Sequence, residues 1–318
     1  MKKLFLSVAV AIMLFSCQKE ETNSVFNENL SAKRICASQD VLEAQLKADP
    51  ALALKMNKIE EFTQNYIQLS ESGRLVNGKI EIPVVVNVLY KTAAENISLT
   101  QIQSQIDILN KDFNALNSDY SQVPTLFSGV KANVGITFVL DQVIRKATTK
   151  TSWGTADAMK KTNRGGLAPT SPTTKLNLWV CTIGGGILGY AQFPGGSSAT
   201  DGVAIDSKYV GLSGAANAPY NLGRTASHEV GHWMNLRHIW GDTTCGSDLV
   251  SDTPTHNDAN YGIPAYPHYS TCSGTPVEMT MNYMDYTDDA GMYMFSTGQK
   301  TRMDAIFAVG GSRASFRL

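Results

Sequence analysis

The sequence predicts an α/β (α+β) domain in which helices pack in layers on a sheet. Apolar runs that alternate or are rich in β-branched residues are typical of strands, and they occur at 80–90, 134–140, 176–183 and 202–206. Elsewhere apolar residues recur every three or four positions, which is typical of amphipathic helices. Residues 241–295 show little periodicity of either kind, so we expect a long irregular region there.

The N-terminal part predicts a separate segment. Polar residues 18–35 are typical of a tether. From Asp40 onwards apolar residues follow a helical spacing on both sides of Pro50. We therefore expect residues 17–78 to form a tether with helices, ahead of a domain at 79–318.

Two capping signals mark further helices. Ser98 and Gln101 fit a capping box ahead of amphipathic residues 102–113. Ser296 and Gln299 fit a second capping box, which predicts the start of the last helix.

Composition excludes some classes of function. A chain of 318 residues can bury a substantial core, and 43% hydrophobic with 17% charged residues is ordinary for a soluble protein. The formal net charge of −1 gives no electrostatic footprint for nucleic acid or an anionic membrane. We expect a monomer that binds no nucleic acid.

The first residues predict export. A lysine pair precedes apolar residues 4–15, a run too short to span a bilayer but suited to a signal peptide. Residues 14–17, Leu-Phe-Ser-Cys, resemble the lipobox of bacterial lipoproteins, which implies a signal peptide at 1–16 and lipid on Cys17. The chain would then be anchored at the bacterial surface or outer membrane, or secreted after its N-terminal segment is removed. The alternative is an ordinary cleaved signal with an incidental Cys17.

Residues 228–238 contain three of the five histidines and predict a metal site. His228 and His232, four positions apart, share one face of a helix, and Glu229 beside them suits a general base rather than a ligand. His238 can join them only if the chain turns back, and Asn235 tolerates the left-handed conformation that such a turn needs. Three imidazoles and a water make a catalytic zinc site with an open position. The short His-Glu-x-x-His motif alone could arise by chance, but the third histidine argues against chance.

These eleven residues resemble the long zinc consensus of the metzincin peptidases, and residues 236–242 resemble the pappalysin family, with cytophagalysin and ulilysin. Asn235 stands where metzincins usually have glycine. The resemblance covers 79–318. It implies a zinc endopeptidase of protein or peptide substrates, with a twisted mixed sheet, a backing helix and an active-site helix above an irregular lower subdomain that ends in a C-terminal helix.

The resemblance also implies the rest of the site. Met284 would lie in the Met-turn beneath the zinc, and the Tyr286 hydroxyl would reach toward the metal and stabilise an oxyanion. Gly189, Tyr190 and Ala191 resemble the edge strand along which metzincins bind an extended substrate. The alternatives are a core or turn methionine and a half-buried tyrosine.

Relatives in this family often prefer arginine on the primed side and use an acidic residue just after the Met-turn. Asp288 and Asp289 lie in that neighbourhood. A solvated acidic turn explains them equally well.

Structural calcium is a further implication of the resemblance. Hard oxygen ligands suit this ion, and the loop after the zinc motif supplies Asp248, Asp252, Thr253, Thr255 and Asp258. Their spacing is not that of an EF-hand. Turn-forming Asp and Thr are the competing explanation.

The cysteines divide by surroundings. Cys245 and Cys272 flank a loop-rich segment of an exported chain, so a disulfide between them is the leading pairing. Cys181 lies in an apolar run and predicts a buried free thiol. The family usually has a second disulfide, whose partners would fall near Ile263 and Gly291 and are both lost.

Cys36, after Lys33 and Arg34, resembles a cysteine switch, in which a propeptide thiolate fills the open position of the zinc. We expect the basic neighbours to favour the thiolate. The propeptide would then be the chain's own inhibitor, and cleavage near Arg74 would release it. The alternatives are an incidental cysteine or an intermolecular disulfide.

Two other functions remain open. A thermolysin-like peptidase would use a downstream acid such as Asp252 as the third ligand, and His238 argues against this. A surface adhesin would keep the peptidase fold without catalysis, and the intact Glu229 argues against that.

Overall fold

The computed structural model describes residues 33–71, 80–212 and 217–316. The signal peptide predicted at 1–16, the lipid site Cys17 and the cleavage position near Arg74 fall outside these residues and stay predictions. A membrane-crossing helix would need to be longer and more apolar than any helix in the described part of the chain. The described residues belong to one compact unit.

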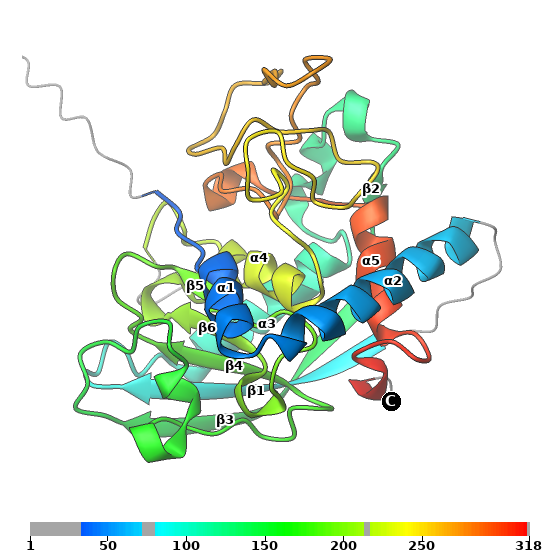
Figure 1. Cartoon of the computed structure of the whole chain (residues 1–318). Coiled ribbons are helices and arrows are strands. Elements are labelled where there is room, and N and C mark those ends of the chain that lie inside the picture. The colour runs from blue at the N-terminus through cyan, green and yellow to red at the C-terminus, as the bar shows by residue number, and fades with distance from the viewer. Residues whose placement is uncertain (1–32, 72–79, 213–216, 317–318) are drawn as a thin grey trace, which may run out of the picture. The chain divides into compact units, whose positions relative to one another are not determined.

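The core of this unit is a five-stranded mixed sheet (Figure 1). Its strands, in the order β3-β1-β4-β6-β5, are Ile136–Ala147, Ile80–Tyr90, Leu176–Cys181, Val203–Asp206 and Gly189–Ala191. The first four run parallel, and β5 lies antiparallel on the edge. The predicted strands are confirmed, although β3 runs seven residues beyond Leu140 and β4 ends at Cys181.

Two helices pack on this sheet. α3 (Leu99–Phe113) contacts β3, and α4 (Arg224–Trp233) contacts β5 and β6. The Ser98 hydroxyl caps α3 as predicted, by accepting from the Gln101 amide at 3.1 Å. The other half of that capping box is wrong, because the Gln101 side chain donates to the Val210 carbonyl instead.

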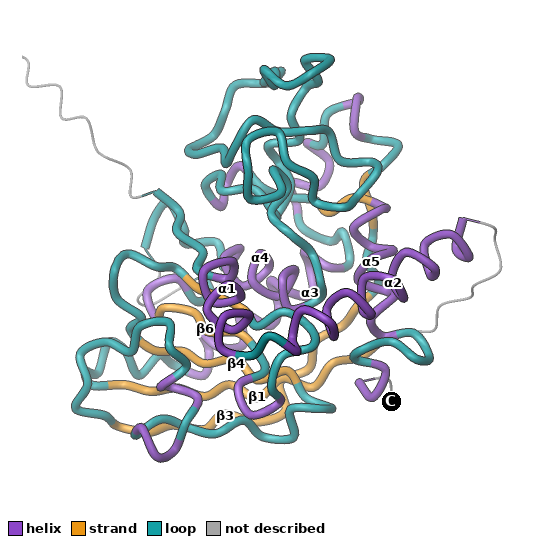
Figure 2. The backbone as a smooth tube through the Cα atoms, viewed as in Figure 1, coloured by secondary structure: helices purple, strands orange, loops and turns teal. Residues whose placement is uncertain are grey.

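The N-terminal segment packs against the domain. α1 (Ser38–Ala48) contacts β5, and α2 (Ala51–Glu71) contacts the last helix, α5 (Thr297–Phe307), beside which Figures 1 and 2 draw it. The capping box predicted at the start of α5 is confirmed, with Ser296 and Gln299 bonded reciprocally.

The region 241–295 is irregular as predicted, and Figure 2 shows most of it as loop. The disulfide predicted between Cys245 and Cys272 is present. Cys181 is buried and free, also as predicted. A Cβ on Gly291 would lie 3.4 Å from Ile263 Cγ1, so the two positions assigned to a lost second disulfide are neighbours in space.

Candidate active site

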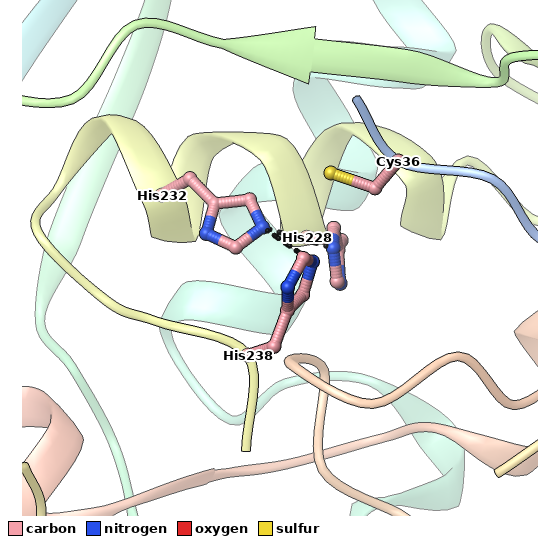
Figure 3. Close-up of side chains that lie close together, drawn as sticks. All are labelled: Cys36, His228, His232 and His238. Carbon is pink, nitrogen blue, oxygen red and sulfur yellow. Dashed lines mark hydrogen bonds between the residues drawn. The ribbon is translucent and has the colours of Figure 1, made fainter. Parts of the chain in front are cut away.

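The metal-binding histidines predicted from the sequence come together around α4 (Figure 3). His228 and His232 lie on this helix, one turn apart. The helix ends at Trp233, and Asn235 takes the left-handed conformation predicted for it, with φ of +73°. This turn brings His238 back to the other two histidines, with all three side chains buried.

The three imidazoles present one nitrogen each to a common point. His232 Nε2 lies 3.1 Å from Nε2 of both His228 and His238. The opposite nitrogens carry the protons, because His228 Nδ1 donates to the Tyr283 carbonyl at 2.7 Å and His232 Nδ1 to the Leu236 carbonyl at 2.8 Å. His238 Nδ1 bonds to the Asp242 carboxylate. Three Nε2 lone pairs therefore face one another, an arrangement that a cation would stabilise.

The chemistry of this group suits zinc. Burial, and then the neighbouring histidines, hold the pKa of His228 well below its ordinary value and lower that of His232 to about 3. Neutral imidazoles are the form that binds a metal, and nitrogen with thiolate sulfur is a donor set that zinc prefers. Cys36 completes the set, with all four ligand atoms within 4.8 Å of one another. Among the described His, Cys, Asp and Glu side chains, no other group of three or more converges in this way.

Glu229 belongs to α4, and its side chain lies against the edge strand β5. Its Oε2 accepts from the Ser38 hydroxyl at 2.8 Å and from the Cys36 thiol at 3.3 Å. A Cβ on Gly189 would come within 3.0 Å of Glu229 Cγ, so the strand approaches the carboxylate closely. Burial raises the pKa of Glu229 to about 7, despite the two hydrogen bonds.

Residues 35–38 cover the edge of β5. Leu188 N–H donates to the Ile35 carbonyl at 2.9 Å, and Ala37 N–H donates to the Gly189 carbonyl at 3.1 Å. Cys36 and Gly189 form a parallel bridge. The N-terminal segment therefore occupies the strand edge that was predicted to receive substrate.

The prediction that basic neighbours acidify Cys36 is wrong. Lys33 lies over the Tyr261 ring, and Arg34 points to Asp289, so neither faces the sulfur. Burial, followed by the charge of Glu229, raises the pKa of the Cys36 thiol well above its ordinary value.

Met284 and Tyr286 lie around the histidines. A Cβ on Gly231 would lie 2.5 Å from Met284 Sδ, so this buried methionine packs directly against α4. The Tyr286 hydroxyl donates to the Cys36 carbonyl at 3.1 Å, and its ring centroid lies 4.9 Å from that of His238.

Of the two acidic residues after the Met-turn, Asp289 is buried and Asp288 half-buried. Asp289 Oδ1 accepts from Arg34 Nη2 at 2.6 Å. The Arg34 guanidinium also donates to the Thr287 carbonyl at 3.3 Å and lies over the Tyr220 ring. Sequence reasoning missed this role of Arg34. A cation two residues before a candidate switch cysteine was the available signal.

The three aspartates proposed for calcium, Asp248, Asp252 and Asp258, do not converge as a ligand group. Asp248 accepts from the Thr253 hydroxyl at 2.9 Å. Asp252 accepts from the Ser296 hydroxyl at 2.6 Å and the Gly298 N–H at 2.8 Å, at the start of α5. Thr255 and Asp258 are exposed. Calcium binding stays a prediction. Asp252 lies outside the histidine group, so the thermolysin-like alternative finds no support.

Comparison with known proteins agrees with this geometry. Residues 180–308 match the peptidase family model described as pregnancy-associated plasma protein-A. Extracellular metalloprotease 1 of Coccidioides posadasii is 33% identical over 258 residues, which are 78% of this chain and 84% of that protein. An extracellular metalloprotease of Colletotrichum graminicola is 34% identical over 265 residues, 79% and 86% of the two chains.

Two solved structures are similar over most of their length. Mature mirolysin of Tannerella forsythia in complex with a cleaved peptide has a TM-score of 0.74 and 41% identity, over 76% of this chain and 97% of that one. A promirolysin variant from the same organism has a TM-score of 0.82 and 37% identity, over 89% and 97%. The chain is therefore a zinc metalloendopeptidase and belongs to the pregnancy-associated plasma protein-A family.

Proposed function

We propose that this protein is an exported zymogen whose mature form cleaves peptide bonds on the N-terminal side of arginine. The ion pair between Arg34 and Asp289 carries the specificity part of this proposal, because the chain's own segment already seats an arginine in a buried acidic pocket beside the metal group. Relatives named extracellular metalloproteases support export. Mirolysin with a cleaved peptide and the promirolysin structure support peptide substrates and a latent form.

The histidines His228, His232 and His238 would hold zinc. Bound there, zinc would polarise the scissile carbonyl and lower the pKa of a water molecule toward about 7. Glu229 is the general base: it takes a proton from the attacking water and returns it to the leaving amine. Its present partners, Ser38 and Cys36, belong to the N-terminal segment, so the departure of that segment frees the carboxylate.

Substrate binding would reuse the contacts that the N-terminal segment now makes. The Leu188 N–H and Gly189 carbonyl of the β5 edge would bond an extended peptide through its backbone. The Tyr286 hydroxyl, which now donates to the Cys36 carbonyl, is available to donate to the developing oxyanion. Met284 would support the histidines from beneath.

Latency in this proposal comes from residues 17–78, with Cys36 as the switch, and activity from residues 79–318. Cys17 carries lipid after removal of residues 1–16, and a cut near Arg74 separates the two parts. Calcium bound near Asp248 would stabilise the loop after the zinc motif.

The test is incubation of the processed protein with a peptide library, with and without chelator. Cleavage before arginine that chelator abolishes is expected, and sequencing the protein's new N-terminus in the same run locates the processing site. Activity that survives the chelator would reject the zinc assignment, and cleavage without regard to arginine would reject the specificity. A Glu229→Ala variant with normal zinc content is the control for the base. If it digests gelatin as well as wild type, the mechanism is wrong.

A further inference from the structure

A second ion pair ties the N-terminal segment to the domain, away from the metal group. Glu60 of α2 binds Arg302 of α5 through both carboxylate oxygens, at 2.8 and 2.9 Å. The Arg302 side chain is 1% exposed and that of Glu60 29% exposed. Such bidentate pairs are the geometry in which arginine recognises carboxylates best.

Among the described residues, no carboxylate of the domain forms an ion pair with this arginine. The buried Asp248 lies close enough to interact with the charge of Arg302, but burial raises the pKa of Asp248 to about 7. Arg302 Nη1 donates to the Leu249 carbonyl at 3.3 Å and Nη2 to the Asn235 carbonyl at 3.4 Å. Its buried Nε has no hydrogen-bond partner. Once α2 leaves, the guanidinium would retain two long bonds to neutral carbonyls, and a partly buried cation of this kind favours an anionic partner.

A second arginine lies close by. Arg237 is exposed and lines a pocket together with Glu60, Asn235, Phe193 and Pro194. Burial alone would raise the pKa of Glu60, but Arg302 and, less strongly, Arg237 hold it below its ordinary value. The two arginines therefore act on the same carboxylate.

The backbone direction of the N-terminal segment places this pocket on the side of the metal group that faces away from Asp289. The chain passes from Arg34, in the acidic pocket, through Cys36 beside Gly189, and then into α1 along β5. Phe193 follows β5, and its ring centroid lies 5.3 Å from that of His232. If Asp289 receives the residue after the cleaved bond, residues before that bond run toward Phe193 and the two arginines.

We propose that Arg302 and Arg237 form a carboxylate-binding subsite, which Glu60 fills in the zymogen and an acidic substrate side chain upstream of the cleaved bond fills in the mature enzyme. This inference rests on the proposed cleavage before arginine. The N-terminal segment then imitates a substrate at both ends, with Arg34 on one side of the metal group and Glu60 on the other.

The first test measures kcat/KM of the processed enzyme on peptide pairs that share an arginine after the cleaved bond. Each pair differs by Glu or Gln at one of several positions upstream. At one or more positions we expect the Glu peptide to be cleaved roughly threefold to tenfold faster, with an advantage that shrinks at high salt. Arg237→Glu should abolish or reverse the preference, while Arg164→Glu, at an exposed site between β3 and β4, should keep it. Equal rates for Glu and Gln at every position would overturn the subsite and leave cleavage before arginine intact.

The second test uses the unprocessed full chain. Glu60→Gln should raise the residual activity of the zymogen roughly threefold to tenfold, because the carboxylate that holds Arg302 is lost. Glu61→Gln changes the exposed neighbour on the same helix and should leave latency unchanged. Equal residual activities in the two variants would show that Glu60 has no part in holding the segment, and would contradict the inference.

Discussion

Arg34 Nη2 lies 2.6 Å from Asp289 Oδ1, and neither side chain is more than 1% exposed. The same carboxylate accepts N–H bonds from Leu222 at 2.8 Å and Arg224 at 3.3 Å, so its position is fixed by the backbone ahead of α4. Because Cys36 follows Arg34 by two residues, the thiol near the histidines and the cation in the acidic pocket hold the same short segment. In the proposed zymogen, latency would then rest on an ionic contact as well as on a thiol.

Removing the charge of Asp289 tests whether this pocket binds the arginine of a substrate. Breaking one side of a buried ion pair costs about 3–5 kcal/mol, so Asp289→Asn in the processed enzyme should lower kcat/KM for arginine peptides by about a hundredfold or more. Asp288→Asn, at the half-buried neighbour, is the matched control and should have little effect. Comparable losses in both variants would mean that the pocket floor lies elsewhere.

The thiol contribution can be separated from the ionic one. Cys36→Ala in the unprocessed chain should produce measurable hydrolysis where wild type shows almost none, because nothing then fills the fourth position beside the three histidines. Cys181→Ala removes the other free thiol that is buried in the described part of the chain, in β4, and should leave the zymogen latent. When the zymogens are loaded with cobalt, wild type and Cys181→Ala should show a thiolate-to-metal absorption band. The Cys36→Ala zymogen should lack it. A fully latent Cys36→Ala chain with an unchanged spectrum would refute the switch.

Substitutions at Asn235 test whether its left-handed backbone conformation is what brings His238 to the other two histidines. Its φ is +73°, where a β-branched residue pays a steric penalty of about 1–2 kcal/mol and glycine pays almost none. Asn235→Gly should therefore keep zinc affinity and unfolding midpoint close to wild type, whereas Asn235→Val should lower both. Zinc titration and urea unfolding of the two variants measure this. A harmless valine would show that another feature sets the turn.

The features predicted well from the sequence are those decided within a few residues. The spacing of His228 and His232, the turn at Asn235 and the cap at Ser296 each depend on a helical repeat or a local backbone preference. Arg34 and Glu60 were missed because their partners, Asp289 and Arg302, lie more than 240 residues away along the chain. Local patterns carry no information about such pairs.

The predictions of calcium binding and of an acidified Cys36 thiol both depend on where side chains point. Oxygen-rich loops suggest calcium, but the same side chains satisfy backbone donors, and Asp252 bonds at the start of α5. Basic residues beside Cys36 suggested an acidified thiol, but both side chains found other partners once the segment folded. The sequence pattern does not specify side-chain direction outside regular elements. That direction overturned the prediction for the Cys36 thiol, while calcium binding stays a prediction.

Because Ile263 and Gly291 are neighbours in space, we predict that cysteines introduced at both positions form a disulfide. Because a Cβ on Gly291 would lie 3.4 Å from Ile263 Cγ1 and 3.6 Å from Cγ2, cysteines at both sites have a suitable separation. The double variant should raise the free energy of unfolding by about 2–4 kcal/mol under oxidising conditions. Thiol titration and urea unfolding with and without reductant measure this, with each single cysteine variant as a control. A double variant that retains two titratable thiols would contradict the predicted proximity.

Asp112 predicts a pH dependence of stability that is independent of the metal ligands. This buried carboxylate on α3 accepts from the Ser227 hydroxyl at 2.6 Å and lies 3.9 Å from Arg224 Nε. Burial raises its pKa from 3.8 to about 6, despite the charge of Arg224. A carboxyl whose pKa is higher in the folded state stabilises the fold below the unfolded-state value and loses that contribution as pH rises through the folded-state value.

Wild type should therefore lose the stabilisation that the protonated Asp112 carboxyl gives as pH rises from about 4 to 7. Asp112→Asn, which cannot titrate at this position, should show no such loss. Over that range wild type should lose up to about 3 kcal/mol of unfolding free energy relative to the variant. Urea unfolding of the full chain at several pH values measures the difference, and Asp107→Asn, exposed on the same helix, controls for the substitution itself. If the unfolding free energies of wild type and Asp112→Asn instead run parallel across this pH range, the pKa of Asp112 is not raised by its burial. Arg224 or the Ser227 hydroxyl would then stabilise the charged carboxylate more strongly than the geometry indicates.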